Sequence, residues 1–156
     1  MTWQSCLTPS GETAPACGHL LGPTNFILRI VPSVKEAQAA FDRDTCGVTF
    51  RSSRGDLDNL ITVYYDCLRQ QARSGSLSFG LVLGHVAAHE VGHVLLAEGA
   101  HNSEGLMRAR LGWEDWRLAA RGALNFTWEE SQHIRAGVLL RMQQESVQTV
   151  TLASHE

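Results

Sequence analysis

The sequence lacks several features that would each define a class of protein: a membrane anchor, a secretory leader, internal repeats and low-complexity tracts. Its one long apolar run, residues 77–97, contains three histidines, three glycines and Glu90, which a lipid-facing helix would not. Charged residues make up only 19% and the net charge is -3, so neither nucleic acid nor an anionic membrane is expected as a partner. None of the four cysteines forms a C-x-x-C pair, which argues against a cysteine zinc site.

The length of the chain and its first residues set further bounds. A chain of 156 residues is long enough for one domain with a hydrophobic core and too short for two, so residues 1–156 are expected to form a single domain. Residues 1–6 have neither the basic start nor the apolar core of a signal peptide. A start trimmed of its export signal and first helix is one expectation for such a sequence.

The most informative string is His89-Glu90-Val91-Gly92-His93, which has the pattern H-E-x-x-H. Residues four apart on an α-helix differ by about 40° around the axis and lie about 6 Å apart along it. His89 and His93 can therefore bind one metal ion from the same helix face. Glu90 lies about 100° further round, where it stays off the metal but can reach a water beside it as general base.

A third histidine follows directly after the apolar run. Gly99 ends that run, and glycine is the usual residue where a helix stops and the chain turns back. The reversed chain can bring His101 to the open side of the metal. Three histidines and one water form the arrangement of a catalytic zinc site.

These residues resemble the metzincin clan of zinc peptidases, whose signature is H-E-x-x-H-x-x-G-x-x-H followed by a methionine-bearing turn. His89, Glu90, His93 and His101 match the ligand, base, ligand and third-ligand positions, and Met107 matches the Met-turn. The short gap between His101 and Met107 is most similar to the matrixin branch. The string is also similar to uncharacterised bacterial proteins with the pattern H-E-x-G-H-x-L-L-x-x-x-x-H-S-x-x-G-I-M. Met107 could instead be an ordinary core residue.

The sequence departs from the clan pattern in its spacing. Seven residues separate His93 from His101, where the clan has five, so either the helix runs further or the turn is wider. Glu98 is the rival third ligand, but on a continuing helix it would lie about 140° round from His93 and face away. Asn102 is a weaker rival. His85 lies one turn before His89 and is expected to support a ligand or to bond to backbone.

The order of the predicted elements indicates an α+β fold. The β-rich segments are residues 25–31, 47–50 and 60–65, and the helical ones are 67–73, 77–97 (capped by Ser76 or Ser78), 113–121 and a last helix that opens on a capping box at Thr127. Residues 7–23 and 51–58 are predicted as loops, 34–41 as a short helix or crossover, and 146–156 as a weakly patterned tail. The resemblance implies a metzincin-like zincin domain: a small mixed sheet, then the active-site helix, the Met-turn and a C-terminal helix.

The resemblance also implies a substrate-binding strand. In metzincins the rim strand of the cleft pairs antiparallel with the substrate, and the last β-rich segment before the metal helix is predicted to take that role. Its residues are Leu60, Ile61, Thr62, Val63, Tyr64 and Tyr65.

The four cysteines indicate disulfides if the protein is exported, as the resemblance to secreted or periplasmic peptidases implies. Four cysteines allow three pairings; Cys6 with Cys17 would close a small loop, and Cys46 with Cys67 would join two strand ends. The alternative is four free thiols in a cytosolic protein.

The sequence thus predicts a zinc-dependent endopeptidase that acts on a peptide or protein substrate, with Zn²⁺ on three histidines and Glu90 as the base. The alternative is a catalytically silent module that keeps the zinc and binds peptides or a protein partner through the same cleft. The pattern does not indicate an oligomeric state.

Overall fold

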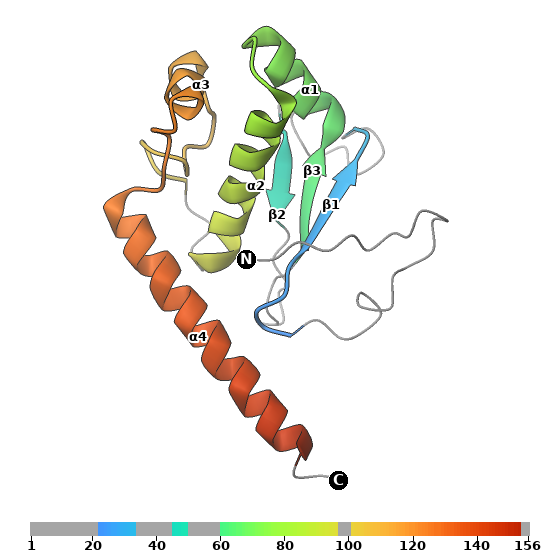
Figure 1. The fold of residues 1–156 in the computed structure, drawn as a ribbon, viewed down its shortest axis with the longest axis vertical. Coiled ribbons are helices and arrows are strands. Elements are labelled where there is room, and N and C mark those ends of the chain that lie inside the picture. The colour runs from blue at the N-terminus through green and yellow to red at the C-terminus, as the bar shows by residue number, and fades with distance from the viewer. Residues whose placement is uncertain (1–21, 34–44, 50–59, 97–100, 154–156) are drawn as a thin grey trace.

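The computed structural model describes residues 22–33, 45–49, 60–96 and 101–153, with side chains up to residue 146. Three strands and four helices follow one another in an α+β order (Figure 1): β1 (Ile27–Val31), β2 (Gly47–Thr49), β3 (Leu60–Tyr64), α1 (Tyr65–Ser74), α2 (Phe79–Leu95), α3 (Trp113–Ala120) and α4 (Trp128–Ala153). The predicted loops 7–23 (for the most part) and 51–58, and the predicted segment 34–41, lie outside the described residues.

The strands form a sheet in the order β1-β3-β2, with β1 parallel and β2 antiparallel to β3. The prediction that residues 60–65 form the rim strand of the cleft is therefore wrong. Leu60 to Tyr64 form the middle strand of the described sheet, and Tyr65 already opens α1. The reason lies in the residues: Ile61, Thr62 and Val63 are all buried, on both faces of the strand, as a central strand requires.

Helix α1 continues directly from β3 and is tied back to β2. A disulfide joins Cys46, next to β2, to Cys67 in the first turn of α1, with 5.1 Å between their Cα atoms. The backbone N–H of Tyr64 also donates to the carbonyl of Cys46 at 2.9 Å. The predicted Cys46–Cys67 pair is thus confirmed, whereas Cys6 and Cys17 lie outside the described residues.

Helix α2 runs alongside β2 and β3 and contributes Val82, Val86 and Val94 to the core (Figure 1). The hydroxyl oxygen of Ser78 accepts a hydrogen bond from the N–H of Leu81 at 3.2 Å, which confirms one of the two predicted caps. No described helix is long and apolar enough to cross a membrane.

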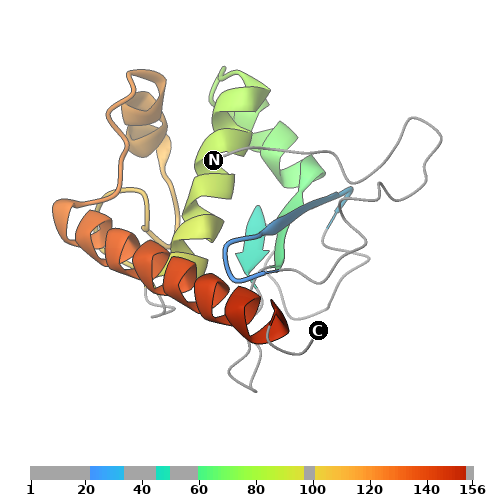
Figure 2. The same ribbon diagram turned by 60° about the horizontal axis from the view of Figure 1, so that its bottom comes forward.

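Helix α2 ends at Leu95, two residues before the predicted end at residue 97. The long helix α4 crosses it at this point (Figure 2). A Cβ on Gly137 of α4 would collide with the carbonyl oxygen of Leu95, and the guanidinium of Arg141 donates to the carbonyl of Val94 at 3.3 Å. Because α4 supplies a donor to a last-turn carbonyl, α2 can end there without another helical turn.

Helix α4 begins as the sequence predicts and ends later. The N–H of Glu130 donates to the hydroxyl of Thr127 at 3.2 Å, and the N–H of Thr127 donates to the carboxylate of Glu130 at 2.7 Å, so the capping box is confirmed. The predicted tail from residue 146 is wrong as far as Ala153, because α4 continues to that residue.

Candidate metal centre

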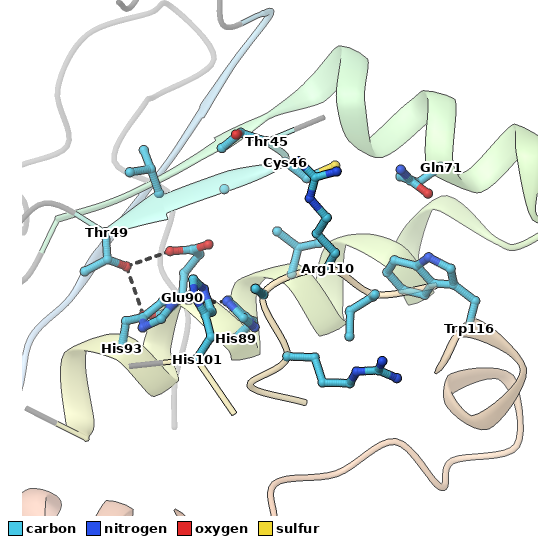
Figure 3. Close-up of a pocket in the computed structure, with 16 residues that line it drawn as sticks. Thr45, Cys46, Thr49, Gln71, His89, Glu90, His93, His101, Arg110 and Trp116 are labelled. Carbon is cyan, nitrogen blue, oxygen red and sulfur yellow. Dashed lines mark hydrogen bonds between the residues drawn. The ribbon is translucent and has the colours of Figure 1, made fainter. Parts of the chain in front are cut away.

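Three histidine side chains converge at one end of α2 (Figure 3). His89 and His93 lie one turn apart on α2, and their Nε2 atoms are 3.0 Å apart. His101 comes from the chain that follows α2, and its ring centroid lies 5.3 Å from that of His89 and 4.8 Å from that of His93. One ligand atom from each of the three lies within 4.8 Å of the others, so the cluster could hold a metal ion.

The ring of His89 is oriented by a backbone contact. Its Nδ1 lies 2.8 Å from the carbonyl oxygen of Leu106, so the Nδ1–H tautomer donates there and leaves Nε2 for the cluster. Burial lowers the pKa of His89; the bond to Leu106 opposes this shift, and the nearby His101 lowers the pKa further. A lowered pKa keeps the imidazole neutral, which is the form that binds a metal.

The loop that carries His101 is anchored to α4. The N–H of Asn102 donates to the carbonyl of Met107 at 2.8 Å, and its side-chain amide donates to the buried carboxylate of Glu130 at 3.1 Å. Asn102 also forms an isolated β-bridge with Arg108. Asn102 is therefore held from both sides, and these contacts place its neighbour His101 opposite the helix.

Helix α2 does not run further to absorb the two extra residues between the second and third histidines, because it ends at Leu95. The rival ligand Glu98 and the predicted helix stop Gly99 lie outside the described residues.

Met107 lies against α2 and is completely buried, which fits both the Met-turn interpretation and an ordinary core residue. A Cβ added to Gly92 would lie 2.5 Å from the sulfur of Met107 and 2.9 Å from the ring of Phe126. Gly92 is thus the position between His89 and His93 at which the turn approaches the helix backbone. The turn itself contains Gly105 with φ 71°, a conformation that favours glycine.

Glu90 is 5% exposed and faces strand β2 (Figure 3). The hydroxyl of Thr49 lies 2.9 Å from its Oε2 and 3.0 Å from its backbone carbonyl oxygen. Burial raises the pKa of Glu90 to about 7, and the hydrogen bond from Thr49 opposes this shift. The carboxyl group therefore lies next to the histidine cluster, with a pKa near neutrality in the metal-free protein.

A cleft of about 600 Å³ runs past the cluster. The cleft is lined by residues 45–49, by α2 with His89, Glu90 and His93, by His101, and by residues 108–111. Arg110 and Trp116 extend the cleft away from the histidines (Figure 3). Arg108 also lines the cleft, and its Nη1 lies 2.9 Å from Oδ1 of the buried Asp115, with which it forms an ion pair.

Most predicted site residues come together here, and two groups do not. His89, Glu90, His93 and His101 all line the cleft. His85 bonds through Nδ1 to the carbonyl of Leu81 at 2.9 Å, the backbone bond that was one of its two predicted roles, and lines a second hollow on α2. Residues 60–65 do not line the cleft, because β2 lies on that side of the sheet.

Thr49 and Gly47 were missed by the sequence interpretation. Both lie on the short strand β2, and a Cβ on Gly47 would lie 2.7 Å from Oε1 of Glu90. The only signal in the sequence is their spacing of two, which places both on one face of a strand. Nothing local connects that face with Glu90, 41 residues away from Thr49.

The donor set fits a metal ion. A tetrahedral zinc ion with bonds of about 2.0–2.1 Å holds its ligand nitrogens roughly 3.3 Å apart. The Nε2 atoms of His89 and His93 are 3.0 Å apart, and the ligand atoms of all three histidines lie within 4.8 Å of one another. Together, fold and site define an α+β protein with a three-histidine cluster that could bind a metal. The chain matches no protein-family model, no curated protein and no solved structure in the comparisons made.

Proposed function

We propose that the protein is a zinc-dependent endopeptidase of the metzincin type. The observation that carries the proposal is that a buried glutamate, Glu90, lines the same cleft as a three-histidine cluster. The order of elements supports the assignment: a mixed sheet, the helix with two of the histidines, the turn at Met107 and a last helix. This is the order that the resemblance implies.

Zinc is the proposed metal because three imidazoles are the usual ligands of a catalytic zinc ion that keeps one position open. His89, His93 and His101 would hold it. Bound there, zinc would lower the pKa of a water and polarise the carbonyl group of the substrate. A site with one open position suits hydrolysis better than a purely structural role.

Glu90 would move the protons. Its carboxylate takes a proton from the attacking water and returns it to the nitrogen of the leaving amine. Burial favours this role, because a base whose pKa is close to the working pH is both ionised and basic enough. A silent zinc module would have no need of such a group.

The substrate would lie along β2 in place of the strand predicted from the sequence. Residues 45–49 line the cleft, and the described ladder of β2 is its pairing with β3 on one side. An extended peptide can add to the other edge of a strand through backbone hydrogen bonds. We further propose that the protein works in an oxidising compartment, secreted or periplasmic, because the Cys46–Cys67 disulfide persists where thiols are not kept reduced.

The test combines zinc analysis with cleavage of a mixed peptide library. The wild-type protein should bind about one zinc per chain and cleave peptides. Glu90→Ala should keep the zinc and lose cleavage by several orders of magnitude, because it removes the base without removing a ligand. Zinc-loaded wild-type protein that cleaves nothing would favour the silent peptide-binding module.

The third ligand is tested separately. His101→Ala should lose zinc and cleavage together, since two histidines alone make a weak site. Glu98→Ala is the matched control and should keep both. If Glu98→Ala loses zinc and His101→Ala retains it, the metzincin assignment is wrong.

A further inference from the structure

Strand β2 contacts the proposed base with two of its three residues. The hydroxyl of Thr49 lies 2.9 Å from Oε2 of Glu90 and 3.0 Å from its backbone carbonyl oxygen. A hydroxyl has one proton, and a bond to a charged carboxylate is stronger than one to a neutral carbonyl. When Glu90 is ionised, Thr49 therefore donates to Oε2.

Gly47 provides the space for the other carboxylate oxygen. A Cβ at this position would lie 2.7 Å from Oε1 and 2.8 Å from Cγ of Glu90. Gly47 and Thr49 are two residues apart on β2, so they share one face of the strand. The side chain of Glu90 thus rests on that face, with Oε2 bonded to Thr49 and Oε1 beside Gly47 at the wall of the cleft (Figure 3).

Strand β2, which contacts the side chain of Glu90, is itself held in place by the rest of the fold. A three-residue strand is short, but β2 pairs with the buried centre of β3, with Gly47 opposite Val63 and Thr49 opposite Ile61. The residue before it, Cys46, is held by the disulfide to α1. Thr49 is therefore a donor on a fixed support and not on a free loop.

We propose that Thr49 is a positioning residue for Glu90. Its hydroxyl holds Oε2 against β2 and so leaves Oε1, beside Gly47, as the oxygen that exchanges protons with the attacking water. The inference rests on the proposed peptidase function. The hydroxyl of Thr49 faces Glu90, so a peptide paired with the backbone of β2 does not need this hydroxyl, and the hydroxyl takes no part in binding the metal. Substitutions that remove it should therefore change the chemical step and not the zinc content.

The main variants are Thr49→Val, which removes the hydroxyl at nearly constant shape, and Thr49→Ser, which keeps it. Thr49→Val should lower kcat by about 10- to 100-fold, the usual effect of losing one hydrogen bond to a charged group. KM should change by less than about 3-fold, and the protein should keep its zinc. Thr49→Ser should restore kcat to within about 3-fold of the wild type, which a purely steric role of Thr49 would not predict.

A matched control is available in Thr24→Val. Thr24 also donates to a carboxylate, that of Glu145 on α4, but it does not line the cleft. This variant should leave kcat unchanged. If Thr49→Val does not fold, Thr49→Ala and Gly47→Ala replace it; the second displaces the carboxylate from its other side and should also lower kcat.

A double-mutant cycle tests the contact without any activity. In zinc-free protein the effects of Thr49→Val and Glu90→Ala on the urea midpoint should be non-additive, because each substitution removes one partner of the same hydrogen bond. An unchanged kcat in Thr49→Val, or equal losses in the Val and Ser variants, overturns the proposal. If the zinc-loaded wild type cleaves nothing, the proposed peptidase function is wrong. The double-mutant cycle then tests the contact between Thr49 and Glu90 by itself: additive effects reject the positioning of Glu90 by Thr49, and non-additive effects support it.

Discussion

Replacing Glu90 by glutamine should make the metal-free protein more stable at pH 8 and change its stability much less at pH 5. Burial raises the pKa of Glu90 to about 7, whereas an unfolded chain titrates near the ordinary value for glutamate, about 4.3. A raised pKa in the folded state means that folding favours the protonated carboxyl. The contribution of the protonated Glu90 carboxyl to the free energy of unfolding is therefore fully present below the unfolded pKa, and it is lost as the pH rises through about 7.

The size of the effect follows from the shift. One pKa unit corresponds to about 1.4 kcal/mol, so ionised Glu90 should cost the folded state roughly 3 kcal/mol at pH 8 and about 1 kcal/mol or less at pH 5. Glutamine keeps the volume of the side chain, stays neutral, and can still accept the hydrogen bond from Thr49. The stability gain of Glu90→Gln should therefore grow by about 2 kcal/mol between the two pH values.

Urea unfolding at both pH values, with EDTA present and the disulfide intact, measures this gain from the shift of the midpoint at constant slope. Glu129→Gln is the control, because Glu129 is exposed on the first turn of α4 and its replacement should change stability by less than about 0.5 kcal/mol. If Glu90→Gln changes stability equally at pH 5 and pH 8, the carboxyl is not held in a buried, uncharged form and the reasoning is refuted.

Three further predictions concern the supports of the site. Gly92→Ala should destabilise the protein by about 1–3 kcal/mol in thermal unfolding, because its Cβ would collide with Met107; a gain in stability would place the Met-turn elsewhere. Reducing the Cys46–Cys67 disulfide, which spans 21 residues, should cost about 3 kcal/mol, measured against a double Ser variant. Glu130→Ala removes the anchor of the His101 loop and should weaken zinc binding about 10-fold or more in a competition titration, whereas unchanged affinity would show that the loop needs no anchor.

The parts of the fold that the sequence predicts are those set by neighbouring residues. The caps at Ser78 and Thr127 depend on side chains that reach a backbone N–H three residues on, and both are confirmed. The pair His89 and His93 is placed by helix geometry alone, and the structure brings their Nε2 atoms to 3.0 Å. Such features require no knowledge of what lies across the core.

The sheet order could not be predicted in this way. The interpretation of residues 60–65 as a rim strand used only their position before the metal helix. The deciding property was present in the composition, because a strand with no alternation of apolar and polar residues is buried on both faces. Ile61, Val63 and Tyr64 are each at most 1% exposed, whereas all three residues of β2 are partly exposed. Strand order follows from such burial across the whole sheet and not from chain order.

The end of α2 was mispredicted for a related reason. The apolar run favours a helix to residue 97, but Arg141, 47 residues beyond Val94, supplies a donor to a last-turn carbonyl at the observed end, Leu95. The contact of Thr49 with Glu90 is likewise made between segments 41 residues apart. In both cases a donor on one element forms a hydrogen bond with an acceptor on another element far away in the sequence. The residues next to the donor or the acceptor do not indicate that bond.

One part of the site is set by local helix geometry, and two parts are set by contacts between residues far apart in the sequence. Helix α2 alone aligns His89 and His93, but His101 comes from a loop in which Asn102 is bonded to Glu130 on α4. Glu90 is on the same helix, yet its carboxylate is oriented by β2, which the disulfide holds in place. These supports are all contacts within the protein, and together they order three separate segments of the chain at one site.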